Sequence, residues 1–310
     1  MRSTDLISIH DLPRDEVQEI LALAGAIKRD PDAYRDALSR RTLAMIFEKP
    51  SLRTRVSFEA GMTQLGGHAI HLGGSDAPLG KRESIPDVAR TLSGMADGIM
   101  ARTFSHQALV DLATHATVPV INGLSDHLHP CQALADFLTI GERLGRVEGV
   151  RVAYVGDGNN VAHSLLYAAA KLGAHLSVAT PKGYEPDAAV VRAARDDARA
   201  TGSRLEAGLD PAAAVDGAEV VYTDTWASMG QEGQHDERVP LFRPYQINAA
   251  LMARARPGAL FMHCLPAHRG EEVTDEVIDS ASSVVFQQAA NRLHAQKAIL
   301  VLLLGGRETP

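Results

Sequence analysis

The sequence has 310 residues, of which 45% are hydrophobic and 22% are charged, and its formal net charge is −7. This length is enough for two α/β domains with cores of their own, and the composition is typical of a globular protein. The negative net charge argues against a nucleic-acid or anionic-membrane surface, but it is compatible with a local basic pocket for a small anion.

Two cysteines, Cys131 and Cys264, are too few for a disulfide framework and do not form a C-x-x-C pair. We therefore expect a reducing, cytoplasmic location. Residues 1–6 lack the long apolar core of a signal peptide. The most apolar run, residues 298–304, is too short to span a bilayer and is typical of the end of a buried helix.

Apolar runs and turn signals predict strands and helices that alternate along the chain. The first block has predicted strands at 43–47, 68–72, 98–102 and 119–122, with helices starting near 14 and 84 and covering 56–65, 106–115 and 130–144. The second block has predicted strands at 150–155, 176–179, 219–223, 260–263 and 284–286, with helices at 161–172, 187–200, 247–255 and 289–304. This alternation predicts an α/β fold with two doubly wound parallel-sheet domains joined by helices. The active site is expected in the interdomain cleft, at the strand C-termini.

A polar cluster, Ser51-Leu52-Arg53-Thr54-Arg55, lies between the first of these strands and a helix. Free backbone N–H groups and the positive end of the helix dipole favour an anion there. Arg53 offers a planar fork for two phosphate oxygens, and Ser51 and Thr54 can donate or cap. The alternative is a simple helix cap with solvated arginines.

Further polar residues follow predicted strands or begin predicted helices. Arg102 ends a strand, which is a common ligand position in α/β folds and also a common solvated sheet edge. His129-Pro130-Cys131-Gln132 opens a helix, where a capping histidine is an alternative. His127 and His129 have the spacing of a metal pair, but no third and fourth ligands follow at suitable spacing.

Residues 156–161, Gly-Asp-Gly-Asn-Asn-Val, are similar to a dinucleotide-binding fingerprint. We reject that interpretation because Val161 occupies the third glycine position and no acidic residue lies near Thr180 to bind a ribose.

Two later polar segments, which begin at Asp224 and at Cys264, also follow predicted strands. Asp224 can hold an ammonium group, and the loop after it, with Ser228 and Gly230, can close as a lid or be merely a polar loop. Cys264 follows His263, which suggests a thiol nucleophile. Neighbouring strand residues point to opposite faces, however, so a buried, inert cysteine is the simpler interpretation.

These motifs, in this order from about Leu6 to Leu304, resemble those of the aspartate/ornithine carbamoyltransferase family. The likeness rests on Ser-Leu-Arg-Thr-Arg, His-Pro-Cys-Gln, the Asn-Asn turn, the Asp-Thr-Trp-Ala-Ser-Met-Gly loop, His-Cys-Leu-Pro and Asn-Arg-Leu-His. The resemblance implies that carbamoyl phosphate contacts Ser51, Leu52, Arg53, Thr54, Arg102, His129, Pro130, Cys131, Gln132, Cys264, Leu265 and Arg292. It implies ornithine contacts at Asn160, Asp224, Ser228 and Met229, and catalytic roles for Arg102, His129, Asp224 and Cys264.

The resemblance also implies an activity and an assembly. We expect transfer of the carbamoyl group to the δ-amine of L-ornithine, giving L-citrulline and phosphate in arginine biosynthesis, with no cofactor and no metal. Residues 1–133 plus 288–310 are the expected carbamoyl phosphate domain, and residues 134–287 the expected ornithine domain. A homotrimer is expected, with no nucleic-acid or membrane partner.

Rival functions remain at this point. N-acetylornithine and putrescine carbamoyltransferases share the phosphate half, but we expect an altered Ser-Met-Gly loop in them and in the aspartate enzymes. A catalytically silent ligand-binding homologue is a further alternative.

The chain departs from the family pattern at two positions. Leu52 replaces a threonine, which leaves a backbone contact. Pro78 replaces a glutamine that reaches a neighbouring subunit's phosphate site, so that contact is in doubt unless Lys81 or Arg82 compensates.

Overall fold

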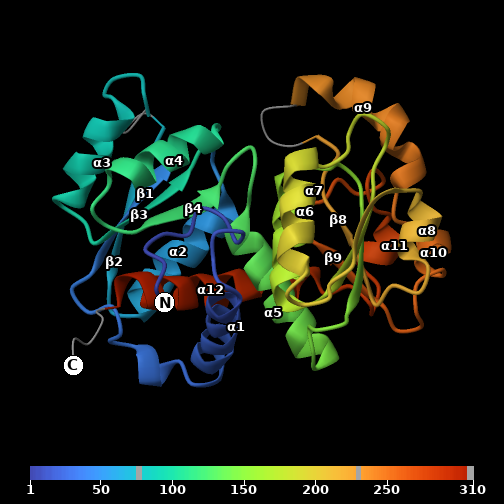
Figure 1. Cartoon of the computed structure of the whole chain (residues 1–310), viewed down its shortest axis with the longest axis horizontal. Coiled ribbons are helices and arrows are strands. Elements are labelled where there is room, and N and C mark those ends of the chain that lie inside the picture. The colour runs from blue at the N-terminus through green and yellow to red at the C-terminus, as the bar shows by residue number, and fades with distance from the viewer. Residues whose placement is uncertain (75–78, 228–231, 306–310) are drawn as a thin grey trace. The chain divides into compact units, whose positions relative to one another are not determined.

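In a computed structural model of the chain, residues 1–74, 79–227 and 232–305 are described. The chain divides into two compact units (Figure 1). Unit 1 comprises Met1–Leu138 and Asn291–Pro310, and unit 2 comprises Thr139–Ala290. Each unit holds one parallel β-sheet, which confirms the predicted α/β class.

The sheet of unit 1 has four strands in the order β2-β1-β3-β4. These are β1 (Thr42–Phe47), β2 (His68–Gly73), β3 (Gly98–Arg102) and β4 (Val120–Leu124). Its helices are α1 (Arg14–Arg29), α2 (Leu52–Gln64), α3 (Ile85–Ser93), α4 (His106–His115), most of α5 (Pro130–Leu144) and the C-terminal part of α12 (Val285–Leu304).

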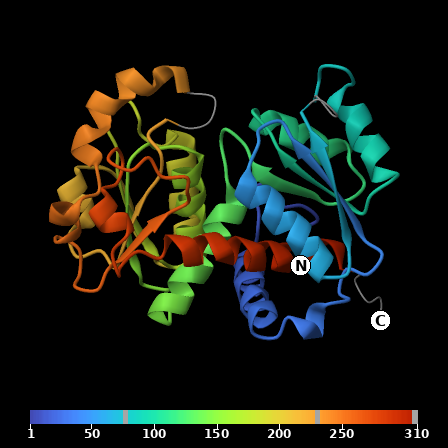
Figure 2. The same cartoon turned by 180° about the vertical axis from the view of Figure 1, so that it is seen from behind.

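Helices cover both faces of this sheet. An apolar cluster joins Ile46 and Ile99 of the strands to Val88 of α3 and Leu109 of α4. On the other side α2 and α12 lie next to each other, as Figure 2 shows, and Gly61 of α2 faces Leu300 of α12. Since both faces are covered, β1 and β3 are apolar and buried along nearly their whole length, as in parallel sheets generally.

The sheet of unit 2 has five strands in the order β7-β6-β5-β8-β9. These are β5 (Arg151–Val155), β6 (His175–Ala179), β7 (Leu205–Leu209), β8 (Val220–Thr223) and β9 (Leu260–His263). Its helices are α6 (Asn160–Leu172), α7 (Ala188–Ala198), α8 (Pro211–Val215), α9 (His235–Phe242), α10 (Ala249–Met252) and α11 (Asp275–Ile278). Buried apolar residues of α8 and α11 pack against Ala153, Val221 and Phe261 of the strands.

Two predicted elements differ in the structure, and one strand was not predicted. The strand expected at 284–286 is wrong, because α12 begins at Val285 after a short pairing in which Phe261 N donates to Ser282 O and Val284 N to Phe261 O. The helix expected at 247–255 covers only Ala249–Met252, since the chain then tightens into three-residue turns. The edge strand β7 was missed, although Leu205, Ala207 and Leu209 alternate with polar residues or glycine.

In both sheets the strand order reverses next to the first strand of the unit. The reversal lies between β1 and β3 in unit 1 and between β5 and β8 in unit 2. Connections leave in opposite directions at such a point, so a crevice opens at the carboxyl ends of the two strands. Among the described helices, none combines the length and the apolar character that crossing a membrane requires.

Candidate functional site

The predicted phosphate residues of unit 1 lie at its point of strand reversal. Phe47 at the end of β1 pairs with Arg102 at the end of β3, and Glu48 N donates to Arg102 O at 2.9 Å. The chain then turns into α2, where Ser51 is the N-cap and its hydroxyl accepts from Thr54 N at 3.3 Å. The first amides of a helix have no acceptor within it, so the start of α2 offers N–H groups to an anion.

Arg292 connects three helices of unit 1. Its Nη1 donates to Gln132 Oε1 of α5 at 2.7 Å, and its Nη2 donates to Thr54 Oγ1 of α2 at 3.2 Å. Gln132 Nε2 in turn donates to Asp136 Oδ1 at 2.8 Å, which fixes the orientation of the Gln132 amide. Residues that lie far apart in the sequence are thus brought together around the start of α2.

His129 lies immediately before α5 and is buried. Its burial, followed by the nearby cations Arg292, Arg102 and Arg53, holds the pKa of its imidazole well below the ordinary value. The ring is therefore neutral near pH 7. These three guanidinium groups act on the same imidazole, so they generate a positive potential around His129 although the net charge of the protein is negative.

The remaining predicted phosphate residues of unit 1 can contribute backbone groups. The Leu52 side chain is 75% exposed and apolar. Pro130 is the first residue of α5, a position that suits proline. Cys131 is fully buried, its thiol donates to Asn122 O at 3.4 Å, and burial raises its pKa to about 12. The Cys131 thiol is therefore not a nucleophile at neutral pH.

A cavity of about 430 Å³ also lies in unit 1, lined in part by Glu48, Lys81, Phe104 and Asp111. Two carboxylates against one ammonium group do not suit a phosphate. We therefore place the anion site at the start of α2 and not in this cavity. Pro78 lies outside the described residues.

The predicted ornithine residues of unit 2 that the structure describes lie at its own point of strand reversal. Asn159 follows β5 and caps α6, with its Oδ1 accepting from Val161 N at 3.0 Å and from Ala162 N at 3.2 Å. Its Nδ2 donates to Asp224 Oδ2, just after β8, at 2.8 Å. Asn160 is the first residue of α6 and is largely buried. Ser228 and Met229 lie outside the described residues.

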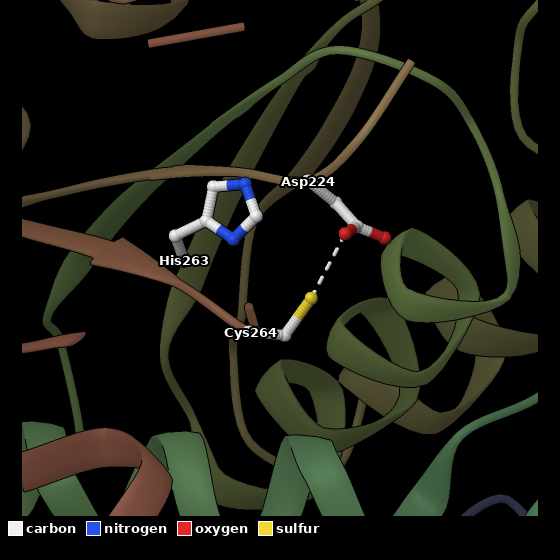
Figure 3. A group of neighbouring side chains, drawn as sticks. All are labelled: Asp224, His263 and Cys264. Atoms are coloured by element: carbon white, nitrogen blue, oxygen red, sulfur yellow. Dashed lines mark hydrogen bonds between the residues drawn. The ribbon is translucent and has the colours of Figure 1, made fainter. Parts of the chain in front are cut away.

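Asp224 also accepts a hydrogen bond from Cys264, which follows β9 (Figure 3). The distance from Cys264 Sγ to Asp224 Oδ1 is 2.9 Å, and both residues are buried. Our expectation that His263 and Cys264 point apart is wrong. One ring nitrogen of His263, the Cys264 thiol and an Asp224 oxygen all lie within 4.8 Å of one another. The reason is that β9 ends at His263, so strand alternation does not extend to Cys264.

By donor chemistry Asp224, His263 and Cys264 could hold a zinc ion. Each is engaged within the protein, however. Asp224 Oδ2 accepts from Asn159, His263 Nδ1 accepts from Leu265 N at 2.8 Å, and His263 Nε2 contacts Glu272 Oε1 at 3.0 Å. Binding of an ion would break these hydrogen bonds, so the group is better described as a polar network.

Sequence reasoning missed Arg238, which organises the segment beside Asp224. Its Nη1 donates to Asp157 Oδ2 at 2.9 Å and to Trp226 O at 2.8 Å, and its Nε donates to Gln234 Oε1 at 3.1 Å. Burial raises the pKa of Asp157 to about 6, although Arg238 opposes the shift. In the sequence Arg238 is one charge in a polar run, and no local signal marks it as buried.

Comparison with known proteins follows this division of the chain. The family model described as aspartate/ornithine carbamoyltransferase, carbamoyl-P binding domain, matches residues 4–142, and the Asp/Orn binding domain of the same family matches residues 148–303. The chain belongs to the aspartate/ornithine carbamoyltransferase family. The predicted family and enzyme class are thereby confirmed.

Several relatives match nearly the whole chain. Ornithine carbamoyltransferase of Pyrococcus abyssi is 55% identical over 100% of this chain and 98% of its own length. A Pyrococcus furiosus protein named ornithine carbamoyltransferase, anabolic, is 56% identical over 97% of this chain and 96% of its own.

Solved structures of the family have the same fold. That of ornithine carbamoyltransferase from Pyrococcus furiosus has a TM-score of 0.95 at 55% identity and covers 98% of both chains. That of the anabolic enzyme from Campylobacter jejuni has a TM-score of 0.93 at 37% identity over 97% of this chain and 99% of its own.

Proposed function

We propose that this protein transfers the carbamoyl group of carbamoyl phosphate to the δ-amine of L-ornithine, giving L-citrulline and phosphate. The observation that carries the proposal is that one chain holds two complementary groups of side chains. Unit 1 has three guanidinium groups around His129, and unit 2 has the hydrogen-bonded Asp224–Cys264 pair. The first suits a dianionic phosphate and the second suits an amine. Relatives above 50% identity along the whole chain are named for this reaction.

We assign carbamoyl phosphate binding to unit 1. Ser51, Arg53 and the first amides of α2 hold the phosphate group, since helix N-termini and guanidinium forks both favour this anion. Arg102, Thr54 and His129 stabilise the carbonyl oxygen as negative charge develops on it. Gln132 contributes to the carbamoyl amide, and Leu52, Pro130 and Cys131 contribute through their backbones. Arg292 keeps Thr54 and Gln132 in place through its two hydrogen bonds.

We assign ornithine binding to unit 2. Asn160, Asp224, Ser228 and Met229 are the proposed contacts with the amino acid. The Asp224–Cys264 pair faces the amine, and the Leu265 backbone faces the carbamoyl group. A Cys264→Ala enzyme with undiminished turnover and ornithine affinity would remove Cys264 from this role.

The proposed reaction is a substitution at the carbamoyl carbon. The deprotonated δ-nitrogen attacks that carbon, the new C–N bond forms, and the C–O bond to phosphate breaks. Phosphate leaves with the bonding electron pair, and the nitrogen then loses a proton. Proximity of the two substrates supplies much of the acceleration, which requires the two half-sites to meet around them.

The experiment is phosphate release from carbamoyl phosphate with L-ornithine, N-acetyl-L-ornithine, putrescine and L-aspartate offered separately. Turnover with ornithine alone is the expected result. Turnover with another amine would overturn the assignment of residues 224–230 as the ornithine loop. Silence with all four substrates, from folded protein, would favour a ligand-binding homologue without catalysis.

We further infer synthesis of citrulline in arginine biosynthesis, a cytoplasmic location and a homotrimer. Synthesis agrees with the relatives that are named anabolic. Two buried cysteines that form no disulfide bond are compatible with a reducing compartment. Light scattering coupled to gel filtration tests the trimer, and a monomeric mass for active protein would overturn it.

A further inference from the structure

Asn159 lies in the turn between β5 and α6, and its side-chain amide is held in one orientation. Its Oδ1 accepts from Val161 N at 3.0 Å and from Ala162 N at 3.2 Å. Both partners are backbone donors, so the atom that faces them is the carbonyl oxygen of the amide. The backbone of Asn159 is fixed as well, because its carbonyl accepts from His163 N at 3.0 Å. The amide cannot turn over without setting its NH2 group against two N–H groups.

The nitrogen of this fixed amide donates to the buried carboxylate of Asp224. The distance from Asn159 Nδ2 to Asp224 Oδ2 is 2.8 Å. The other oxygen, Oδ1, accepts from Thr225 N at 2.8 Å and from Cys264 Sγ at 2.9 Å (Figure 3). A carboxylate oxygen can accept about two hydrogen bonds. Among the described residues, the contacts of Asp224 therefore fill Oδ1 and leave one acceptor position on Oδ2 for a ligand.

Helix capping alone does not explain an asparagine at position 159. Aspartate and asparagine cap helices about equally well. Two other helices of unit 2 have aspartate caps: Asp187 Oδ1 accepts from Ala189 N at α7, and Asp210 Oδ1 accepts from Ala213 N at α8. An ionised aspartate at position 159 would cap α6 but would set a second negative charge against Asp224 and donate no hydrogen bond. The amide group therefore has a purpose beyond the cap.

We propose that Asn159 is a positioning residue for the amine substrate, because it orients the Asp224 carboxylate so that Oδ2 can accept from the ligand. This inference rests on the proposed function, in which Asp224 contacts ornithine. Asn159 acts through Asp224, whereas the next residue, Asn160, is proposed to contact the amino acid itself. A neutral donor suits this role, since a cation would satisfy the carboxylate in place of the substrate amine.

The first test compares Asn159→Ser with Asn159→Asp. Both replacements keep an oxygen that can cap α6, but serine is too short to reach Asp224 from the cap and an ionised aspartate has no hydrogen to donate. We expect the melting temperature of Asn159→Ser to stay within about 4 °C of wild type. At about pH 8.5, kcat/KM for ornithine should fall by about tenfold in Asn159→Ser and by about 10²-fold in Asn159→Asp, where the added charge repels the Asp224 carboxylate.

The pH dependence separates orientation of Asp224 from capping of α6. In Asn159→Asp two carboxyl groups lie in contact, so one of them keeps its proton above the ordinary aspartate pKa of about 3.9. That proton can bridge the two groups as the amide hydrogen does. The loss of kcat/KM relative to wild type should therefore shrink by at least about threefold between pH 8.5 and pH 5.5. In Asn159→Ser the loss should not vary with pH, because the hydroxyl does not titrate in this range.

The ratio of the two variants isolates this effect of the added carboxyl group. Other titratable or charged groups around Asp224 and its neighbours are the same in both variants; they are Tyr154, Asp157, Arg238, His263, Cys264 and Glu272. Equal pH dependence of kcat/KM in the two variants would overturn the orienting role of the amide.

A binding measurement does not depend on turnover. Titration calorimetry of L-ornithine in the presence of inorganic phosphate reports binding without reaction, because phosphate carries no carbamoyl group. We expect the Kd of ornithine to rise by about tenfold in Asn159→Ser, and the Kd of phosphate to stay within about twofold, since unit 1 is unchanged. Wild-type protein that binds ornithine but forms no citrulline from carbamoyl phosphate would overturn the proposed function and leave the role of Asn159 intact.

Asn248→Asp is the matched control. Asn248 caps α10, where its Oδ1 accepts from Leu251 N at 3.0 Å. The same replacement at this cap should change neither kcat/KM nor Kd for ornithine, because Asn248 is not one of the residues around Asp224. Values of kcat/KM and Kd that both stay within about twofold of wild type in Asn159→Ser would overturn the proposal. An Asn159→Asp enzyme at least as active as wild type at pH 8.5 would also overturn it. Asn159→Ser adds no charge, so it decides the question even if Asn159→Asp does not fold.

Discussion

The two units place their candidate residues at equivalent points of two parallel sheets but give them opposite charge. At the strand reversal of unit 1, Arg53, Arg102 and Arg292 lower the pKa of His129. At the strand reversal of unit 2, burial raises the pKa of Tyr154 well above its ordinary value, and the nearby carboxylates Asp224 and Asp157 raise it further. Topology determines where a ligand can bind, and the side chains there determine which charge it carries.

The units also differ in how they hold these charges. Two bonds of the Arg292 guanidinium group go to neutral groups, Gln132 and Thr54, which position it without cancelling its charge. Asp224 is likewise hydrogen-bonded to the neutral Asn159 and Cys264. The neighbouring Asp157 is paired with Arg238. In unit 2 one carboxylate is thus available to an amine while the other stabilises the surrounding segment.

The largest expected effect concerns the cations of unit 1. Arg102→Leu should lower kcat/KM for carbamoyl phosphate by about 10³-fold, because the group that stabilises developing charge is removed from a buried site. Steady-state kinetics with saturating ornithine measure this. A loss of less than about tenfold would show that the positive potential of unit 1 does not depend on Arg102.

The carboxylate paired with Arg238 should appear in the pH dependence of stability. Asp157 has a pKa of about 6 against 3.8 ordinarily, so the folded protein retains a proton that the unfolded chain has lost. Its contribution to the free energy of unfolding is therefore full below about pH 4 and falls by about 3 kcal/mol as the pH rises to about 6. Urea denaturation from pH 4.5 to 7.5, with Asp157→Asn subtracted, isolates this contribution. A difference that does not vary with pH would contradict the shift.

The other carboxylate should affect the amine substrate. Asp224→Asn removes the charge at nearly constant shape, so we expect kcat/KM for ornithine to fall by about 10²-fold. The Kd of carbamoyl phosphate, measured calorimetrically, should stay within about twofold, since unit 1 is unchanged. A comparable loss of carbamoyl phosphate affinity would refute the division of labour between the units.

The smallest expected effect uses two matched helix caps of unit 1. Ser51 and Ser84 each accept a hydrogen bond from the amide three residues on, at 3.3 Å and 3.2 Å. Replacement of either by alanine should lower the free energy of unfolding by about 1 kcal/mol. Carbamoyl phosphate affinity should fall only in Ser51→Ala, because that cap belongs to the proposed phosphate site. If both variants bind carbamoyl phosphate with the same affinity, Ser51 caps α2 but does not contact the phosphate.

Local features of the fold could be predicted from the sequence. The caps at Ser51 and Ser84 were recognisable because the capping serine, the amide that donates to it and the start of the helix lie within four residues. The strand at residues 284–286 was predicted wrongly, because a short apolar run does not distinguish a strand from the start of a buried helix. The edge strand β7 was missed, since half of it faces solvent.

Long-range partners could not be predicted from local patterns. Arg238 is buried against Asp157, and His263 against Glu272, yet each pair is joined only by the fold. The order of the strands places Asp224 beside Asn159, and that order is fixed by packing of the whole sheet and not by any one segment. The family motifs indicated which residues to examine but not what holds them.

The boundary between the units falls inside two continuous helices, α5 and α12, so unit 1 is built from both ends of the chain. A ribosome makes this chain from its N-terminus, so all of unit 2 is synthesised before Asn291. Arg292, which bonds to Thr54 and Gln132, therefore emerges only after the whole of unit 2. Synthesis of the phosphate half begins before that of unit 2 and is completed after it, so a nascent chain cannot assemble the phosphate half until all of unit 2 has been made.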